Sequence, residues 1–134
     1  LKTLSGSKER ILLVEDEPLV RSSVKRLLQS LGYVVTVAGD GEEALRLLRN
    51  EPSAVDLVIS DISMPRMSGL ELTKTLLAEQ PDAKIVLYTG FTDRLDEVTS
   101  NSLGIKKLLA KPISRDALSV AVREALGPAP AIVS

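Results

Sequence analysis

The sequence Ile-Leu-Leu-Val-Glu-Asp-Glu occupies residues 11–17, so four apolar residues are followed at once by three acidic ones. A short, continuous apolar run is typical of a strand that is buried on both faces of a sheet. Comparable runs recur at 33–38, 57–59, 85–88 and 108–110. Segments with helical spacing separate and follow them. This alternation predicts an α/β domain, a doubly wound parallel sheet with helices on both faces.

Five segments carry the helical spacing, and Gly32, Gly39-Asp40-Gly41, Gly69, Gly104 and the N-cap residue Ser114 bound them. The expected apolar faces consist of Leu19, Val20, Val24, Leu27, Leu28 and Leu31; of Ala44, Leu45, Leu47 and Leu48; of Leu70, Thr73, Leu76 and Leu77; of Leu95, Val98 and Leu103; and of Ala117, Leu118, Ala121, Val122 and Leu126.

Composition narrows the functional class. The 134 residues suit one domain, and we expect a flexible lead-in at 1–8, the domain at 9–126 and a tail at 127–134. With 17 basic and 18 acidic residues, no basic excess favours nucleic-acid binding. The absence of His and Cys excludes imidazole and thiolate chemistry within the chain. No apolar run could span a bilayer, so we expect no membrane contact, and a small domain without cysteine fits the cytoplasm.

Polar residues follow the apolar runs at the positions where sites form in such sheets, beyond the carboxyl ends of the strands. Glu15 and Asp16 follow the first run, and Asp61 follows the third. If those two strands are neighbours, their carboxylates face each other and repel. A Mg²⁺ ion, which prefers oxygen ligands, would relieve this repulsion. Either aspartate alone could simply begin a turn, but the pair at equivalent strand ends favours a metal site.

Two further groups lie at the same predicted edge. Lys111 follows the fifth run directly before Pro112, and its ammonium would neutralise charge or bind a phosphoryl oxygen. Thr89 ends the fourth run, where its hydroxyl could donate to a phosphoryl oxygen or simply close a strand. A carboxylate nucleophile, a metal, an amine and a hydroxyl together suit phosphoryl transfer to an aspartate. An ionised aspartate needs no base, so the absence of His is no obstacle.

Four segments together resemble the receiver domain of two-component response regulators: ILLVEDEP at 11–18, LVISDISMPRMSG at 57–69, LYTG at 87–90 and LLAKP at 108–112. The resemblance extends from about Arg10 to Leu126. It implies the flavodoxin-like strand order 2-1-3-4-5. It also implies a phosphoprotein of a phosphorelay, which acts in signal transduction by changing conformation when it is phosphorylated.

The resemblance further assigns roles to individual residues. Asp61 would be the phosphoacceptor and Asp16 a direct Mg²⁺ ligand, with Glu15 acting through water. The backbone carbonyl of Ser63 would complete the protein ligands. Lys111 would contact the phosphoryl group and Thr89 would bond it to begin the switch. The donor would be a phosphohistidine on a histidine kinase or a histidine phosphotransfer protein.

Two positions depart from the pattern of that family. Leu108 stands where an aromatic residue is common, which removes the aromatic switch that often couples Thr89 to the output surface. Phe91 stands where polar residues are common. Since an apolar side chain there would shield an acyl phosphate from water, the sequence predicts slow autodephosphorylation, to be tested with Phe91→Glu.

Several alternatives remain open at this point. A receiver-fold module that binds proteins without phosphorylation gains support from Leu108. A haloacid-dehalogenase-type phosphatase would need an aspartate where Ser63 stands, so a stand-alone turnover enzyme is disfavoured. No Gly-rich loop for a nucleotide follows the first run. The sequence suits a fragment of a hybrid sensor histidine kinase or a single-domain regulator, and it leaves homodimerisation through the last two helices open.

Overall fold

A computed structural model describes residues 9–89, 107–110 and 113–127. The strands in these ranges form one five-stranded sheet in the order β2-β1-β3-β4-β5, and every neighbouring pair is parallel. Their bounds are Arg10–Val14 for β1, Val34–Ala38 for β2, Leu57–Asp61 for β3, Ile85–Thr89 for β4 and Lys107–Ala110 for β5. The predicted fold class and strand order are therefore confirmed.

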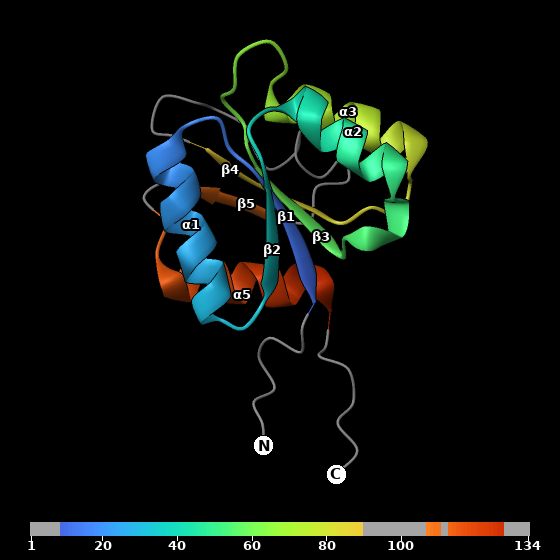
Figure 1. Ribbon diagram of the computed structural model, residues 1–134. Coiled ribbons are helices and arrows are strands. Elements are labelled where there is room, and N and C mark those ends of the chain that lie inside the picture. Colours follow the sequence, from blue (N-terminus) through green and yellow to red (C-terminus); the bar gives the residue numbers. More distant parts are fainter. Residues whose placement is uncertain (1–8, 90–106, 111–112, 128–134) are drawn as a thin grey trace.

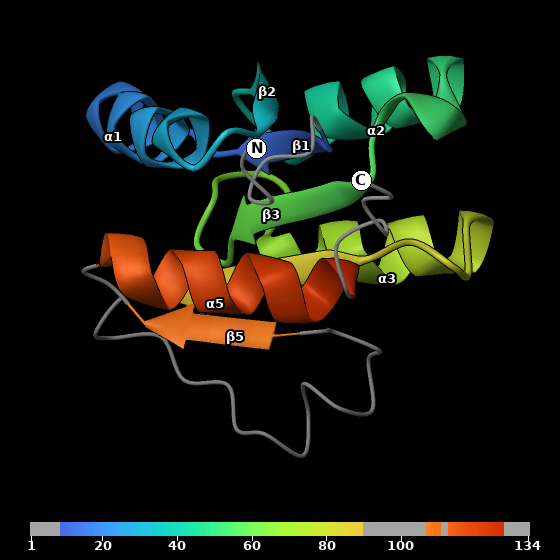
Figure 2. The same ribbon diagram turned by 90° about the horizontal axis from the view of Figure 1, so that it is seen from below.

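Helices cover both faces of this sheet. They are α1 at Pro18–Ser30, α2 at Gly41–Asn50, α3 at Gly69–Glu79 and α5 at Arg115–Leu126, with a 3-10 turn at Pro52–Ala54. Figure 1 shows α1 and α5 on one face and α2 and α3 on the other. In Figure 2 the sheet runs between these two layers. The chain thus winds in both directions from β1, as right-handed crossovers require.

The sequence sets the helix ends through capping. The Asp40 side chain accepts a hydrogen bond from the Glu43 amide at the start of α2. Ser68 forms a capping box with Glu71 at the start of α3, and Ser114 caps α5 as expected. These contacts satisfy amide groups that have no partner within the helix, and each such cap contributes about 1 kcal/mol.

The core has two parts, one on each side of the sheet. Side chains of β1, β3 and β4 pack with α1 and α5 on one side, and with α2 and α3 on the other. Strands β1 and β3 are almost wholly buried. Strand β2 lies at an edge of the sheet, so the side chains of its first four residues alternate between exposed and partly buried, and only Ala38 is buried. The acidic residues Glu15, Asp16 and Asp61 thus follow or end the two most deeply buried strands, β1 and β3.

Some expectations fall outside the described residues. These are the helix expected around Leu95, Val98 and Leu103, the side chains of Phe91 and Lys111, and the terminal segments 1–8 and 128–134. Among the described helices, none combines the length and the apolar composition needed to cross a bilayer.

Candidate metal and phosphoacceptor site

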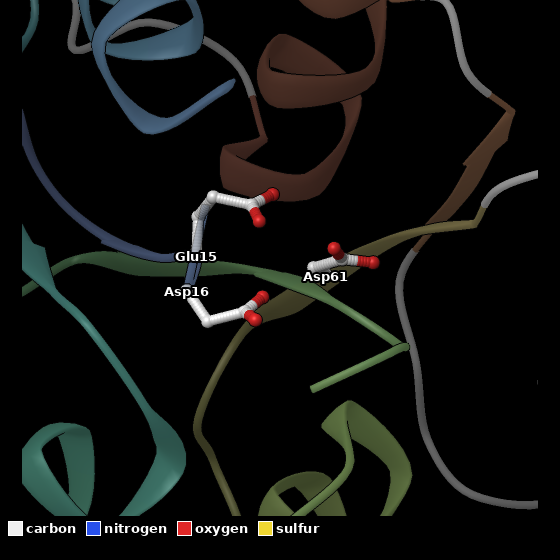
Figure 3. Close-up of side chains that lie close together, drawn as sticks. All are labelled: Glu15, Asp16 and Asp61. Carbon is white, nitrogen blue, oxygen red and sulfur yellow. The ribbon is translucent and has the colours of Figure 1, made fainter. Parts of the chain in front are cut away.

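Three acidic side chains meet at the carboxyl end of the sheet. Glu15 and Asp16 directly follow β1, and Asp61 is the last residue of β3. Because β1 and β3 are hydrogen-bonded neighbours, with Val14 paired to Ser60, the two strand ends deliver these residues to one place. One carboxylate oxygen from each lies within 4.8 Å of the others. Figure 3 shows the three carboxylates around a common space.

Burial makes this cluster unusual. Glu15 is 0% exposed and Asp61 is 2% exposed, whereas Asp16 is only partly buried. An exposed carboxylate lowers the stability of the fold little, but a buried carboxylate is strongly unfavourable unless hydrogen bonds or an opposite charge compensate for its lost hydration. The cluster therefore concentrates negative charge in a place where water screens it poorly.

Hydrogen bonds hold two of the carboxylates in place. The Glu15 Oε2 atom accepts from the Glu17 amide at 3.1 Å, and its Oε1 atom accepts from the Tyr88 hydroxyl. The Asp61 Oδ1 atom accepts from the Ser63 amide at 3.1 Å. The Arg21 guanidinium contacts the same turn by donating to the Glu15 backbone carbonyl at 2.9 Å. Backbone amides near the strand ends and the Tyr88 hydroxyl thus restrain the carboxylates of Glu15 and Asp61.

Tyr88 is a site residue that the sequence pattern does not point to, because it stands within an otherwise apolar strand. Its side chain is fully buried, and its hydroxyl meets Glu15. Burial raises the pKa of the Tyr88 hydroxyl far above its usual range, and the hydrogen bond to Glu15 and the nearby charges raise it further. The available signal was a phenol within an otherwise aliphatic strand, since a buried hydroxyl needs a partner.

The loop after β3 is packed tightly behind Asp61. The Gly69 amide donates to the Ile62 carbonyl at 2.8 Å. A Cβ atom at Gly69 would lie 2.4 Å from the Asp61 carbonyl oxygen and 2.9 Å from the Ile62 Cα atom. Only glycine permits this approach. The first residue of α3 therefore packs directly against the backbone of Asp61 and Ile62.

This arrangement fits a hard divalent cation. Three carboxylates supply oxygen ligands of the kind that Mg²⁺ prefers, and a cation would offset their mutual repulsion. Mg²⁺ usually takes one or two carboxylates and keeps several waters, which agrees with a site that is only partly open at Asp16. The prediction that Glu15, Asp16 and Asp61 come together is confirmed at the level of geometry.

The other predicted residues are placed less completely. Thr89 ends β4, and its backbone pairs with Ala110, the last residue of β5. Lys111 follows Ala110 directly but lies outside the described residues. Ser63 is exposed two positions after Asp61, and the contact described for it is made by its amide. The roles proposed for the Thr89 hydroxyl, the Lys111 ammonium and the Ser63 carbonyl stay predictions.

Comparison with known proteins identifies the family. Residues 11–123 match the model of the response regulator receiver domain. The chain belongs to this family. A receiver domain from Clostridium thermocellum superimposes with a TM-score of 0.83 and 28% identity, over 88% of this chain and 94% of that one. The response regulator TrrA from Thermotoga maritima, solved in complex with Mg²⁺-BeF, has a TM-score of 0.78 and 36% identity, over 88% and 99% of the two chains.

Curated relatives are longer than this receiver domain. A probable transcriptional regulator, ycf27, from Guillardia theta is 35% identical over 90% of this chain, which corresponds to 46% of the relative. The sensor kinase CckA from Brucella abortus is 40% identical over 92% of this chain, but over only 13% of the kinase. The chain thus spans less than half the length of these two relatives. Receiver domains serve in two-component signalling, where they take phosphoryl groups from histidine kinases and use Mg²⁺ at an acidic site.

Proposed function

We propose that this receiver domain accepts a phosphoryl group on Asp61, from a phosphohistidine on a histidine kinase or a phosphotransfer protein. The observation that carries the proposal is the meeting of Glu15, Asp16 and Asp61 at neighbouring strand ends, with two of them buried. Asp16 and Asp61 would ligate Mg²⁺ directly, Glu15 would act through water, and the Ser63 carbonyl would complete the protein ligands. When bound, Mg²⁺ would neutralise the charge that develops on the transferred phosphoryl oxygens.

Phosphoryl transfer to an aspartate requires mainly that the reacting groups are positioned and that developing charge is stabilised. A carboxylate oxygen of Asp61 attacks phosphorus, an O–P bond forms, and the P–N bond to the donor imidazole breaks. The Ser63 amide, 3.1 Å from Asp61 Oδ1, restricts rotation of the nucleophile. Lys111 and Thr89 would bind the phosphoryl oxygens after transfer. Water later attacks phosphorus and releases inorganic phosphate, slowly if Phe91 shields the acyl phosphate.

Phosphorylation would then shift the domain between two conformations. The new phosphoryl oxygens favour whichever state brings Thr89 and Lys111 closest to them. Leu108 lies in β5, where the common aromatic switch is absent, so the coupling between Thr89 and the output surface would follow another route.

Similarity to part of a sensor kinase supports a place within a hybrid kinase, whereas similarity to transcriptional regulators supports a separate regulator. Either role would place the domain in the cytoplasm, and homodimerisation remains part of the proposal.

Acetyl phosphate and Mg²⁺ provide the direct test. Intact-mass spectrometry should find one added phosphoryl group on the native chain and none on Asp61→Asn. Asp56→Asn is the matched control, because Asp56 lies just before the amino end of the same strand and should leave the adduct unchanged. A folded native chain without an adduct would contradict the proposal and favour the phosphorylation-independent binding module.

A further inference from the structure

We propose that the Tyr88 hydroxyl is a positioning group for the Mg²⁺ site, which it serves by fixing the carboxylate of Glu15. This inference rests on the proposed function, since it concerns the same metal. Tyr88 is not a ligand itself in this proposal. It acts from the strand on the far side of β3, through one hydrogen bond to Glu15 Oε1.

The path of the Tyr88 side chain supports this role. Strand β3 lies between β4, which carries Tyr88, and β1, which Glu15 follows. The two outer strands are therefore two strand spacings apart, about 9–10 Å. The ring packs in the apolar layer under α1 and α5 and is fully buried there, while its hydroxyl extends to the acidic cluster. A long, rigid side chain with two rotatable bonds bridges this gap at a low cost in entropy.

The hydrogen bond completes the restraint on Glu15. Its Oε2 atom already accepts from the Glu17 amide at 3.1 Å, and Tyr88 holds the other oxygen. With donors on both oxygens, the plane of the carboxylate is fixed even though two like charges lie nearby. Without the phenol, repulsion from Asp16 and Asp61 would favour rotation of Glu15 away from the metal position.

Packing alone does not explain the hydroxyl. A phenylalanine would fill the same apolar space without carrying a polar group into it, and burying a hydroxyl is unfavourable unless it is hydrogen-bonded. The partner that satisfies it is a member of the metal cluster. Removing the hydrogen-bond partner of a direct ligand typically changes metal affinity by about 10–100-fold, and because Glu15 would act through water, loss of the Tyr88 hydroxyl should cost no more than the lower end of that range.

Tyr88→Phe tests the proposal without any phosphoryl donor. Isothermal titration of the chain with MgCl₂ should show a dissociation constant raised several-fold, up to about 10-fold. Tyr33→Phe is the matched control, because the Tyr33 hydroxyl is also in a largely buried side chain but contacts Arg123 at 3.2 Å. It should leave the dissociation constant unchanged. A merely structural loss would lower the unfolding temperature and leave Mg²⁺ affinity alone.

A double-variant cycle separates the possible outcomes. Glu15→Gln should weaken Mg²⁺ binding, and adding Tyr88→Phe should then weaken it no further, because Tyr88 acts through Glu15. Additive losses would overturn the inference, and so would a Glu15→Gln chain with native affinity, which can be measured even if Tyr88→Phe fails to fold. So would a folded Tyr88→Phe chain with native affinity. If the native chain itself did not bind Mg²⁺, the proposed function would fail instead.

Discussion

The surroundings of the carboxylates differ between the two ends of the sheet. At the amino end, carboxylates lie against arginines: Glu9 accepts from Arg123 at 2.6 Å, and Asp56 accepts from the Arg10 backbone amide at 2.7 Å and its guanidinium at 3.4 Å. At the carboxyl end, three carboxylates lie against one another within 4.8 Å. Strands β1 and β3 connect the two ends, because each begins beside an ion pair and leads to the acidic cluster.

This difference separates charge that is paired within the fold from charge that, in the proposed function, would bind a cation. The Arg10–Asp56 pair holds the start of β1 to the start of β3. Burial opposes ionisation of Asp56, but the hydrogen bonds from Arg10 outweigh it and lower the pKa of that carboxyl. The carboxyl-end cluster instead gathers like charges, and two of its members are buried. Repulsion among these carboxylates would lower the stability of the metal-free domain, and a bound cation would offset it.

The largest expected effect concerns the backbone behind Asp61. Gly69→Ala would place a Cβ atom 2.4 Å from the Asp61 carbonyl oxygen, so the backbone must move. We expect a loss of about 2 kcal/mol or more in the free energy of unfolding, measured in urea, and weaker Mg²⁺ binding. Gly41→Ala is the control at the start of α2. Its Cβ would meet the flexible Met67 side chain at 2.7 Å, so the loss should stay below about 1 kcal/mol.

Equal losses for the two glycine variants would show that the contact with the Asp61 backbone has no special weight. A Gly69→Ala chain of native stability would show that the loop after β3 yields easily. Either result would weaken the view that the carboxyl edge is built around a fixed position of Asp61.

Alkaline pH tests the buried phenol at the carboxyl edge. Because the folded state raises the pKa of Tyr88, the hydroxyl contributes stability that is complete below its unfolded pKa of about 10 and is lost as the pH rises further. Between pH 9 and 11, the native chain should lose about 1.4 kcal/mol more than Tyr88→Phe. Urea unfolding at both pH values measures this. Identical pH profiles for the two chains would contradict the burial of an intact phenol.

The smallest effects should have opposite signs at the two ends. Asp16→Asn removes a like charge from the cluster, so the free energy of unfolding without Mg²⁺ should rise by up to about 1 kcal/mol. Asp56→Asn weakens a partly exposed contact with Arg10, so the free energy of unfolding should fall by about 1 kcal/mol or less. Mg²⁺ should raise the unfolding midpoint of Asp56→Asn but hardly that of Asp16→Asn. The same sign for both variants would remove the contrast between the two edges.

Much of this molecule was predictable from local sequence. The apolar runs indicated the strands to within a residue or two, because a strand buried on both faces must be apolar throughout. Ser114 indicated the start of α5, and Gly127 ends it with a φ of 87°. The acidic residues were recognisable because they directly follow buried strands, where a sheet of this class binds its ligands.

Other features needed the tertiary structure. Sequence alone could not show that β2 has alternating exposure, because that follows from its place at the edge of the sheet. Nor could it assign Tyr88 to the site, since its partner Glu15 lies 73 positions away in the chain. Local composition determines which segments are strands and which residues end them, because a strand that is buried on both faces must itself be apolar, whatever its neighbours are. Which side chains meet is decided only when parallel strands align and bring distant residues to one edge.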